Sequence, residues 1–493
     1  MTRSKTLSFL PVLLIAALSL AACSGVPNKC TGTCVIGGNA TVSLTLSAVP
    51  LTPPPGTSIL SFAVTLSSVQ LTPTSGSAVN IPLNTATYVV DFTRVQSDSA
   101  FLGQVLANVP AGTYNKVTVG VTSAVVTYCT DLGGIPGCDA GSVKQVSQAA
   151  ASTPATSSFS ATLTSGQKTG IQIQFNFTNA ITISATQPQV VSAVNLGSNV
   201  MTAGVLAPTS ANSSLGTGQL DFVEDLTGVV TAASASSVTV KTSTRGSITA
   251  ALNSSTFLVP NCVTTGAACS PSTVGQFASI DTALNSDGTF TALEYDPIDT
   301  TSSDWIEGIV SFTPSFPTQL QIVTNDFSLA STGSHIANLS LGDPVQVTLN
   351  SVKPFVVDKK GLPVTVTPFD NSTDATTILP GQTVALHVTA FTAKNGTVLA
   401  AATADTVVLR FTRVAGKIST VASPFFNLQS LPPSFGPTAS YQVQVSSGSP
   451  STNYDGVPNT SSLAVGNTVA IRALYFGSQF APSFSAAKVR AFF

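Results

Sequence analysis

Seven cysteines are the residues of this 493-residue chain whose types and spacing point most directly to chemistry. Six of them form three close pairs, namely Cys30 with Cys34, Cys129 with Cys138, and Cys262 with Cys269. Close pairs in an exported protein favour disulfides that staple local loops. The alternative is metal binding, but the pairs lack the two-residue spacing of zinc knuckles and have no histidine nearby. The sequence therefore predicts three local disulfides, with no metal site and no cofactor.

The seventh cysteine, Cys23, ends a segment with the layout of a secretory signal. Residues 1–22 begin with basic side chains, continue through an apolar stretch at 7–20, and end in small residues. That stretch is too short for a membrane span, which needs about 20 apolar residues. The boundary Leu20-Ala21-Ala22-Cys23 resembles the lipobox of bacterial lipoproteins, whose cysteine is diacylated before the signal is removed. The alternative is an ordinary secretory cleavage site that happens to precede a cysteine.

The lipobox resemblance implies an exported protein held at a membrane through lipid on Cys23. Two or three acyl chains, at ~0.8 kcal/mol per buried CH₂, give a stable anchor. Ser24 follows the cysteine where an aspartate would retain the protein, and by the same resemblance this permits transfer to the outer membrane. We expect residues 1–22 to be a signal peptide and residues 23–38 a lipidated tether. The remainder is expected to face the periplasm or the cell surface.

Histidine chemistry has little support, because His335 and His387 are the only two histidines. They lie too far apart in sequence for a local metal or catalytic motif, and each is expected to be an ordinary polar residue of a strand or loop. The chain also lacks a Gly-x-Ser-x-Gly elbow and a phosphate-binding loop. We predict that the protein is not an enzyme. A hydrolase with dispersed groups stays open, and it would require a histidine beside a serine and a carboxylate in a cleft.

Acidic side chains are a second source of candidate chemistry, because paired carboxylates can hydrolyse glycosidic bonds. The candidates are Asp221, Glu224 and Asp225, the segment 294–299, and Asp304 with Glu307. We predict instead that they are solvated residues between modules. The segment 285–288 weakly resembles a calcium loop but lacks its later ligands, and a hairpin turn explains it better. Trp305, the only tryptophan, is expected in a core rather than on a sugar-binding platform.

Composition excludes several functional classes. The formal net charge is −2, so no basic face for a nucleic acid is expected. Charged residues make up 8% of the chain against about 25% in an average globular protein. Apolar residues make up 43%, but no later run approaches the roughly 18 residues of a second membrane span. A surface of hydroxyls and amides, as in many extracellular β proteins, is therefore expected.

The elements that must position these residues are predicted to be short strands. The 30 prolines and 36 glycines separate Val-, Thr-, Leu- and Phe-rich runs. Period-two alternation at 40–46, 61–71 and 87–92 predicts strands with one buried face. Pro110 and Gly112 provide a turn into the next strand. Several short strands at this spacing, without a long amphipathic helix, favour a β-sandwich.

The first part of the chain resembles domain of unknown function 4382, which is common in bacterial lipoproteins. The resemblance rests on the opening Val-Ser-Leu-Thr-Leu strand, Val64-Thr-Leu-Ser-Ser-Val-Gln-Leu-Thr-Pro73, Phe101-Leu-Gly103 and Val109-Pro-Ala-Gly-Thr-Tyr114. It implies a prealbumin-like or immunoglobulin-like sandwich, placed at 39–205, and brings no known catalytic residues. The Cys129/Cys138 loop would be a stapled insertion between strands.

A polar stretch at 206–224 is predicted to be a flexible linker, and internal similarity follows it. The repeated openers are Leu226-Thr-Gly-Val-Val230, Ile306-Glu-Gly-Ile-Val310 and Val414-Ala-Gly-Lys-Ile418. The repeated closers begin at Val274-Gly, Leu341-Gly, Pro380-Gly and Val465-Gly, each a glycine turn into an alternating strand. These segments resemble domain of unknown function 5666, which implies small β modules. We place the modules at 225–300, 301–412 (enlarged, with two closers) and 413–493.

The sequence as a whole predicts an all-β protein with an N-terminal sandwich followed by about three small β modules or barrels. We expect a non-catalytic, lipid-anchored cell-envelope protein that acts as a structural or interaction scaffold. Its expected partners are the membrane, through Cys23, and an envelope protein or a glycan, with no nucleic acid. The alternative is a glycan- or peptide-binding surface lipoprotein that uses loops or exposed sheet edges.

Overall fold

The structure is a computed structural model of the whole chain. It describes residues 38–51, 56–130, 136–148, 154–186, 188–208, 212–263, 273–315, 318–350, 355–370, 378–436, 438 and 440–492. The predicted signal peptide, Cys23 and the Cys30/Cys34 pair lie outside these residues. Residues 38–493 form one compact unit, and the all-β prediction is confirmed. Among the described residues, no helix has the length and hydropathy of a membrane-spanning segment.

The N-terminal part is a sandwich of two sheets. The first sheet has the order β12-β9-β1-β5, with β1 (Asn39–Val49), β5 (Ala100–Pro110), β9 (Lys168–Asn176) and β12 (Met201–Val205). The second is built on the long pair β2 (Thr57–Pro73) and β6 (Gly112–Thr130), with β3 (Val79–Ile81), β4 (Tyr88–Asp91), β7 (Lys144–Ser147) and β8 (Ala155–Leu163). The strands β10 (Ile181–Ile183) and β11 (Val191–Val194) form a small separate hairpin sheet after the short helix α1 (Phe177–Ala180).

The sandwich core follows the predicted alternation. On β1, Val42, Leu44 and Leu46 are fully buried, and they belong to the same core as Phe62 and Phe175 on other strands. The prediction of a single buried face is wrong for β1, because its polar face is also buried, and Thr45 on that face donates a hydrogen bond to Asp221, which follows the sandwich in the chain. The predicted turn is also present, since β5 ends at Pro110 and β6 begins at Gly112. Apolar side chains at every second position therefore position the two sheets face to face.

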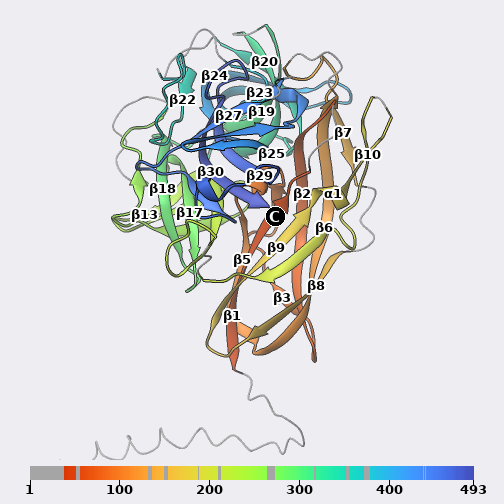
Figure 1. The fold of residues 1–493 in the computed structure, drawn as a ribbon, viewed down its shortest axis with the longest axis vertical. Coiled ribbons are helices and arrows are strands. Elements are labelled where there is room, and N and C mark those ends of the chain that lie inside the picture. The colour runs from red at the N-terminus through yellow and green to blue at the C-terminus, as the bar shows by residue number, and fades with distance from the viewer. Residues whose placement is uncertain are drawn as a thin grey trace, which may run out of the picture. The chain divides into compact units, whose positions relative to one another are not determined.

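Three six-stranded barrels follow the sandwich, and Figure 1 shows them in green, cyan and blue. Barrel 1 contains β13 (Gln219–Ala233), β14 (Ser237–Lys241), β15 (Ser247–Ala251), β16 (Phe257–Leu258), β17 (Phe277–Asn285) and β18 (Phe290–Asp299). Barrel 2 contains β19 (Trp305–Ser315), β20 (Gln319–Ser328), β21 (Pro344–Leu349), β22 (Phe355–Val357), β23 (Thr383–Thr392) and β24 (Ala400–Arg410). Barrel 3 contains β25 (Thr412–Ala422), β26 (Phe425–Gln429), β27 (Tyr441–Val445), β28 (Asn453–Asp455), β29 (Thr468–Tyr475) and β30 (Phe484–Phe492).

The three barrels share one topology. In barrel 1 the strand order is β15-β14-β13-β17-β18-β16, and a parallel pairing of β15 with β18 closes the barrel. Barrels 2 and 3 repeat this order and this closure. Five strands closed by a parallel pair between the third and the last form an OB-type Greek-key barrel, with the short fourth strand added outside the closed ring.

Two glycines in each repeat explain the openers and closers. In the openers, a Cβ at Gly228 would lie 2.1 Å from the Lys241 carbonyl oxygen, and one at Gly308 would lie 2.4 Å from that of Val323. The neighbouring strand therefore approaches too closely for a side chain. In the closers that lead into β17 and β29, Gly275 and Gly466 have φ of +89° and +90°. The predicted glycine turn is present there.

Two details of the predicted organisation need correction. β13 begins at Gln219, so the last residues of the predicted linker 206–224 form a barrel strand. The two closers of the enlarged module are also not equivalent. The closer at 341–347 leads into β21, the third strand of the barrel ring, whereas the one at 380–386 leads into β23, the counterpart of β17 and β29. A glycine turn before an alternating strand is thus not specific to one strand position.

Candidate functional site: a buried ionic junction

The structure separates the two histidines. Nδ1 of His387 on β23 lies 2.7 Å from Oδ1 of Asp405 on β24, and its ring lies 5.4 Å from that of Trp305. His335 is exposed on a loop, where its backbone N–H donates to Asp304. Three cavities found among the described residues are lined by neither histidine. His387 therefore lies beside a carboxylate, but neither histidine lines these three cavities.

Trp305 packs in a core, as predicted. Its side chain is buried and stacks on Phe277 of barrel 1, with ring centroids 5.4 Å apart and an interplanar angle of 9°. Offset stacking of this kind adds to the energy of area burial. Trp305 therefore joins barrels 1 and 2 and is not available as a sugar platform.

The prediction that the acidic candidates are solvated is wrong for most of them, although Asp299 is partly exposed and the side chain of Glu224 lies outside the described part of the structure. Asp221, Asp225 and Asp296 are 3%, 1% and 0% exposed, and Glu294 and Glu307 are also buried. A buried carboxylate is tolerated only when it is paired or hydrogen-bonded. The basic partners of these carboxylates come from distant parts of the chain, so no local sequence pattern points to them.

These carboxylates belong to a set of charged side chains that we call the ionic junction. Its members are linked by ion pairs and lie where the sandwich and the barrels meet. They are eight bases, Arg94, Arg245, Lys360, Arg410, Arg413, Arg472, Lys488 and Arg490, and ten acids, Asp98, Asp221, Asp225, Asp281, Glu294, Asp296, Glu307, Asp326, Asp358 and Asp455. Nearly half of the chain's 19 basic and 21 acidic residues thus gather at one place.

Barrels 1 and 3 meet through a bidentate pair. The Nη1 and Nη2 atoms of Arg472 lie 2.5 and 2.6 Å from the two carboxylate oxygens of Asp281. Arg490 of barrel 3 also lies 3.6 Å from Asp221 of barrel 1. Planar fork-to-carboxylate geometry of this kind gives direction as well as energy. The basic partners all lie on barrel 3 and the acidic ones on barrel 1.

Barrels 1 and 2 meet around Arg410, the last residue of β24. Its guanidinium contacts Asp358 in its own barrel and lies 3.3 Å from Asp225 and 3.4 Å from Asp296 of barrel 1. Lys360, also in barrel 2, lies 3.2 Å from Asp225 and donates a hydrogen bond to Ser279. One basic group therefore holds several carboxylates from two barrels.

The sandwich joins the junction through the short segment between β4 and β5. Arg94 pairs with Glu307 of barrel 2, and Asp98 lies 3.1 Å from Nζ of Lys488 in barrel 3. Arg490 donates to the Asp98 carbonyl at 2.6 Å and to the Ser99 hydroxyl at 3.0 Å. All four modules thus contribute to one buried network.

Equivalent positions of the three barrels carry complementary chemistry. Counting from the opener glycine, the same position is Asp225, Trp305 and Arg413 in barrels 1, 2 and 3. Counting from the closer glycine, the same position is Asp281, His387 and Arg472. These two positions are paired across strands in barrels 2 and 3. The repeats have therefore become acidic, aromatic and basic at the faces where they meet.

The electrostatics of the junction are uneven. Burial raises the pKa of Asp225, but Lys360 and Arg410 outweigh it and hold the pKa well below the usual range. The pKa of Glu294 is raised to about 8, mainly by burial and also by Asp281 and Asp358, while Lys360 and Arg472 oppose the shift. Burial and Asp358 likewise raise the pKa of Asp296. The acids thus fall into a well-compensated group and a poorly compensated group.

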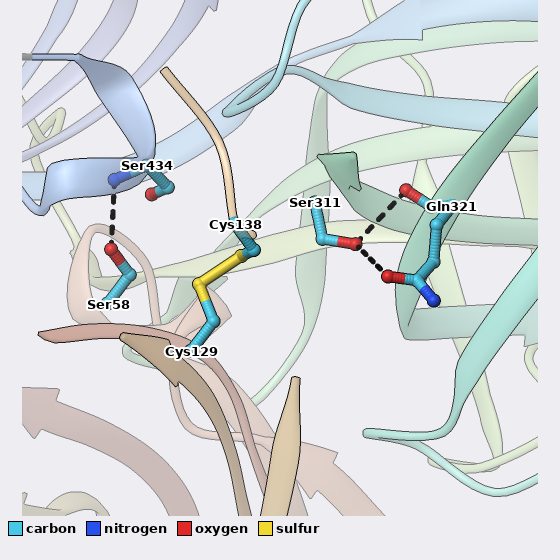
Figure 2. The surroundings of a disulfide bond; sticks show 6 residues. All are labelled: Ser58, Cys129, Cys138, Ser311, Gln321 and Ser434. Atoms are coloured by element: carbon cyan, nitrogen blue, oxygen red, sulfur yellow. Dashed lines mark hydrogen bonds between the residues drawn. A yellow bond between two sulfur atoms is a disulfide. The ribbon is translucent and has the colours of Figure 1, made fainter. Parts of the chain in front are cut away.

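The predicted disulfide between Cys129 and Cys138 is present and lies between modules (Figure 2). Cys138 donates its backbone N–H to the Ser311 carbonyl of barrel 2 at 2.8 Å. Ser58 of the sandwich accepts a hydrogen bond of 2.9 Å from the backbone N–H of Ser434 in barrel 3. The staple therefore presents a sandwich loop to the barrels. Cys262 is also disulfide-bonded, and its predicted partner Cys269 lies outside the described residues.

Two cavities adjoin barrel 1. The junction cavity, of about 230 Å³, opens among the three barrels and is lined partly by charged members of the junction. The barrel groove, of about 620 Å³, lies between the sandwich and barrel 1, and none of its lining residues is charged. Within the described ranges, no group of three or more His, Cys, Asp or Glu side chains is arranged to hold a metal ion.

Comparison with protein families agrees with both resemblances. Residues 39–192 match the family model of domain of unknown function DUF4382, and residues 227–294 match that of domain of unknown function DUF5666. The first match falls on the sandwich and the second on barrel 1. No curated protein matches the chain. Barrels 2 and 3 share the strand order of the matched barrel.

Proposed function

We propose that this protein is a non-catalytic, lipid-anchored envelope protein whose β modules form a rigid scaffold. The observation that carries the proposal is the ionic junction, because it ties a sandwich and three barrels together through buried charges. Removing one partner of a buried ion pair typically costs about 3–5 kcal/mol, so a network of such pairs opposes separation of the modules.

The chemistry of the junction supports a structural role. Its arginines are directed at carboxylates of other modules rather than at a cleft, as in the Asp281–Arg472 pair. Complementary faces also select one arrangement among similar barrels, because two acidic faces or two basic faces would repel each other. A scaffold needs this fixed geometry, whereas linked binding modules more often move independently.

The rigidity can be measured with two spin labels on exposed turns of different barrels. Val274 in barrel 1 and Val465 in barrel 3 are 60% and 67% exposed and precede equivalent closer glycines. Labels on Val274→Cys and Val465→Cys should give one narrow distance distribution by double electron–electron resonance. A broad or multimodal distribution in the otherwise unaltered protein would refute the rigid scaffold.

The anchor is a separate part of the proposal and rests on the sequence around Cys23. In cells, Cys23→Ala should move the protein from the membrane fraction to the soluble fraction, because the acyl chains would be absent. Cys30→Ala, which leaves the lipobox intact, is the matched control and should stay with the membrane. Retention of the Cys23→Ala protein in the membrane would contradict lipid anchoring.

The barrel groove favours a second candidate function, the binding of an uncharged glycan. Its sides carry hydroxyl and amide groups, including those of Asn84, Thr249 and Thr289, and its apolar part includes Phe101 and Phe290. It lies against β15 and the turn between β17 and β18, which correspond to the ligand-binding face of OB-type barrels. Its volume falls within the range of small-ligand sites.

A glycan array tests this candidate with a blocked groove as control. Thr249→Arg would place a long charged side chain in the groove. The control is Thr239→Arg, at the half-buried cross-strand neighbour of Thr249, because Thr239 does not line the groove. Glycan binding should be lost only in Thr249→Arg. Binding that survives this substitution, or no binding by the unaltered protein, would remove the candidate.

A further inference from the structure

The junction cavity is the place where the ionic network meets open space. It lies among all three barrels, with Glu294 from barrel 1, Lys360 from barrel 2 and Arg472 from barrel 3 in its lining. Ser451 and Pro450 of the loop after β27 also line it, and Ser451 is exposed. At about 230 Å³ it exceeds several-fold the roughly 30 Å³ that one water molecule occupies in the liquid.

Glu294 is the cavity residue whose charge is least well compensated. Glu294 is 9% exposed, and its Oε1 atom accepts no hydrogen bond from the described part of the chain. The nearest base is Lys360, whose Nζ lies 3.4 Å from Oε1 but also serves Asp225 at 3.2 Å. By contrast, Asp281 in the same lining has both oxygens bound by Arg472.

The charge balance indicates what the cavity would accept. The cavity lining carries two acids, Asp281 and Glu294, and two bases, Lys360 and Arg472. Arg472 is bound by both oxygens of Asp281, and Lys360 is shared between Asp225 and Glu294, so an ionised Glu294 is the lining group whose charge a cation would balance. The described cavity residues offer no three-ligand set for a metal ion. Phe257 and Leu362 add apolar surface to the lining, which suits a ligand with a short carbon chain.

We propose that the junction cavity binds a small primary ammonium ion, with the Glu294 carboxylate as its counter-ion. The ammonium group would donate to Glu294, and its carbon chain would lie toward the apolar lining near Phe257. Such a ligand would act at the contact of three barrels and would stabilise their assembly by mass action. This inference does not depend on the glycan candidate, since the two sites are lined by different residues.

Binding should be linked to a proton. The charged groups that face Glu294 are Lys360 and Asp358 of barrel 2, Asp281 and Asp296 of barrel 1, and Arg472 of barrel 3. Because the pKa of Glu294 is raised to about 8, the free site holds a proton at neutral pH and must release it to pair with the ammonium group. Affinity should therefore rise as the pH increases through about 8.

Isothermal titration of the mature protein with propylammonium provides the test, with propionate as the probe of opposite charge. We expect propylammonium to bind with a dissociation constant on the order of 1 mM and propionate not to bind. Glu294→Gln should weaken the affinity about tenfold or more, because a charge-assisted hydrogen bond is lost. Glu294→Gln should also abolish the rise of propylammonium affinity with pH.

A second pair of variants keeps the test independent of the carboxylate. Ser451→Trp would obstruct the cavity from its exposed loop, whereas Ser447→Trp changes an exposed residue of the same loop that does not line it. Only Ser451→Trp should abolish the binding of propylammonium. The proposal is overturned if propylammonium does not bind, if propionate binds instead, or if Ser451→Trp and the unaltered protein bind equally well.

Discussion

At the scale of single residues, burial changes the meaning of the charged side chains. A chain with 8% charged residues would be expected to keep them in water. Here Arg94, Arg245 and Arg410 are among the largest fully buried side chains of the described residues. Each reaches a carboxylate of a different module, and Arg94 and Arg410 each have at least two such partners to offset desolvation.

Arg410 should be one of the most sensitive positions of the protein. Arg410→Met removes the base that lies among Asp225, Asp296 and Asp358 and leaves these carboxylates without it. We expect a loss of about 3–5 kcal/mol in the free energy of unfolding, measured by urea denaturation. Lys417→Met, at an exposed position of β25, is the control and should change it by no more than about 0.5 kcal/mol. Equal effects of the two substitutions would argue against a cohesive junction.

The junction also predicts how stability depends on pH. Bases hold the pKa values of Asp98, Asp225 and Glu307 below the usual range, although burial opposes this, so their contribution is lost as the pH falls below about 4. The pKa values of Glu294 and Asp296 are raised, mainly by burial, so the folded state retains protons that the unfolded chain loses above about pH 4. The stability that protonated Glu294 and Asp296 give the folded state is therefore lost as the pH rises toward about 8 and beyond.

Stability should therefore be greatest where these two windows meet, at about pH 4–5. Urea midpoints across this range would check the prediction, and Glu294→Gln should flatten the alkaline limb. A free energy of unfolding that keeps rising from about pH 6 to about pH 9 would show that the raised pKa values are not realised.

At the scale of elements, the sequence predicted the strands well because their signals are local. Alternation identified the side chains of β1 that face the sandwich core, and the opener and closer glycines marked turns and close strand contacts. The partners of the acidic candidates could not be found in this way. Asp281 and Arg472 are 191 residues apart, and no periodicity connects two residues that meet only when two barrels pack. The alignment of the closers nevertheless contained a signal, since Asp281, His387 and Arg472 occupy one position.

A charge-reversal cycle tests whether the barrel faces recognise each other. Asp281→Arg and Arg472→Asp should each destabilise the protein, and the double variant should recover part of the loss. We expect a coupling energy of about 1–3 kcal/mol from chemical denaturation. The partly exposed Lys394–Asp343 pair within barrel 2 is the control, with a coupling of about 0–1 kcal/mol. Equal coupling energies for the Asp281–Arg472 pair and the Lys394–Asp343 pair would contradict the idea that the barrels recognise each other by charge.

At the scale of the whole molecule, the sequence suggested separate β modules joined by linkers, and the structure joins residues 38–493 into one compact unit. The sandwich contributes Arg94 and Asp98 to the junction and presents the loop closed by Cys129 and Cys138 to the barrels. A disulfide that closes so short a loop gives only modest local stabilisation. Its position between modules gives the staple a role in assembly that spacing alone could not reveal.

Differential scanning calorimetry of the mature protein near pH 6 tests the central claim most directly, which is that buried ion pairs make the four modules one cooperative unit. We expect a single unfolding transition whose calorimetric and van't Hoff enthalpies agree. Two or more separate transitions, corresponding to a sandwich and barrels that unfold independently, would contradict it.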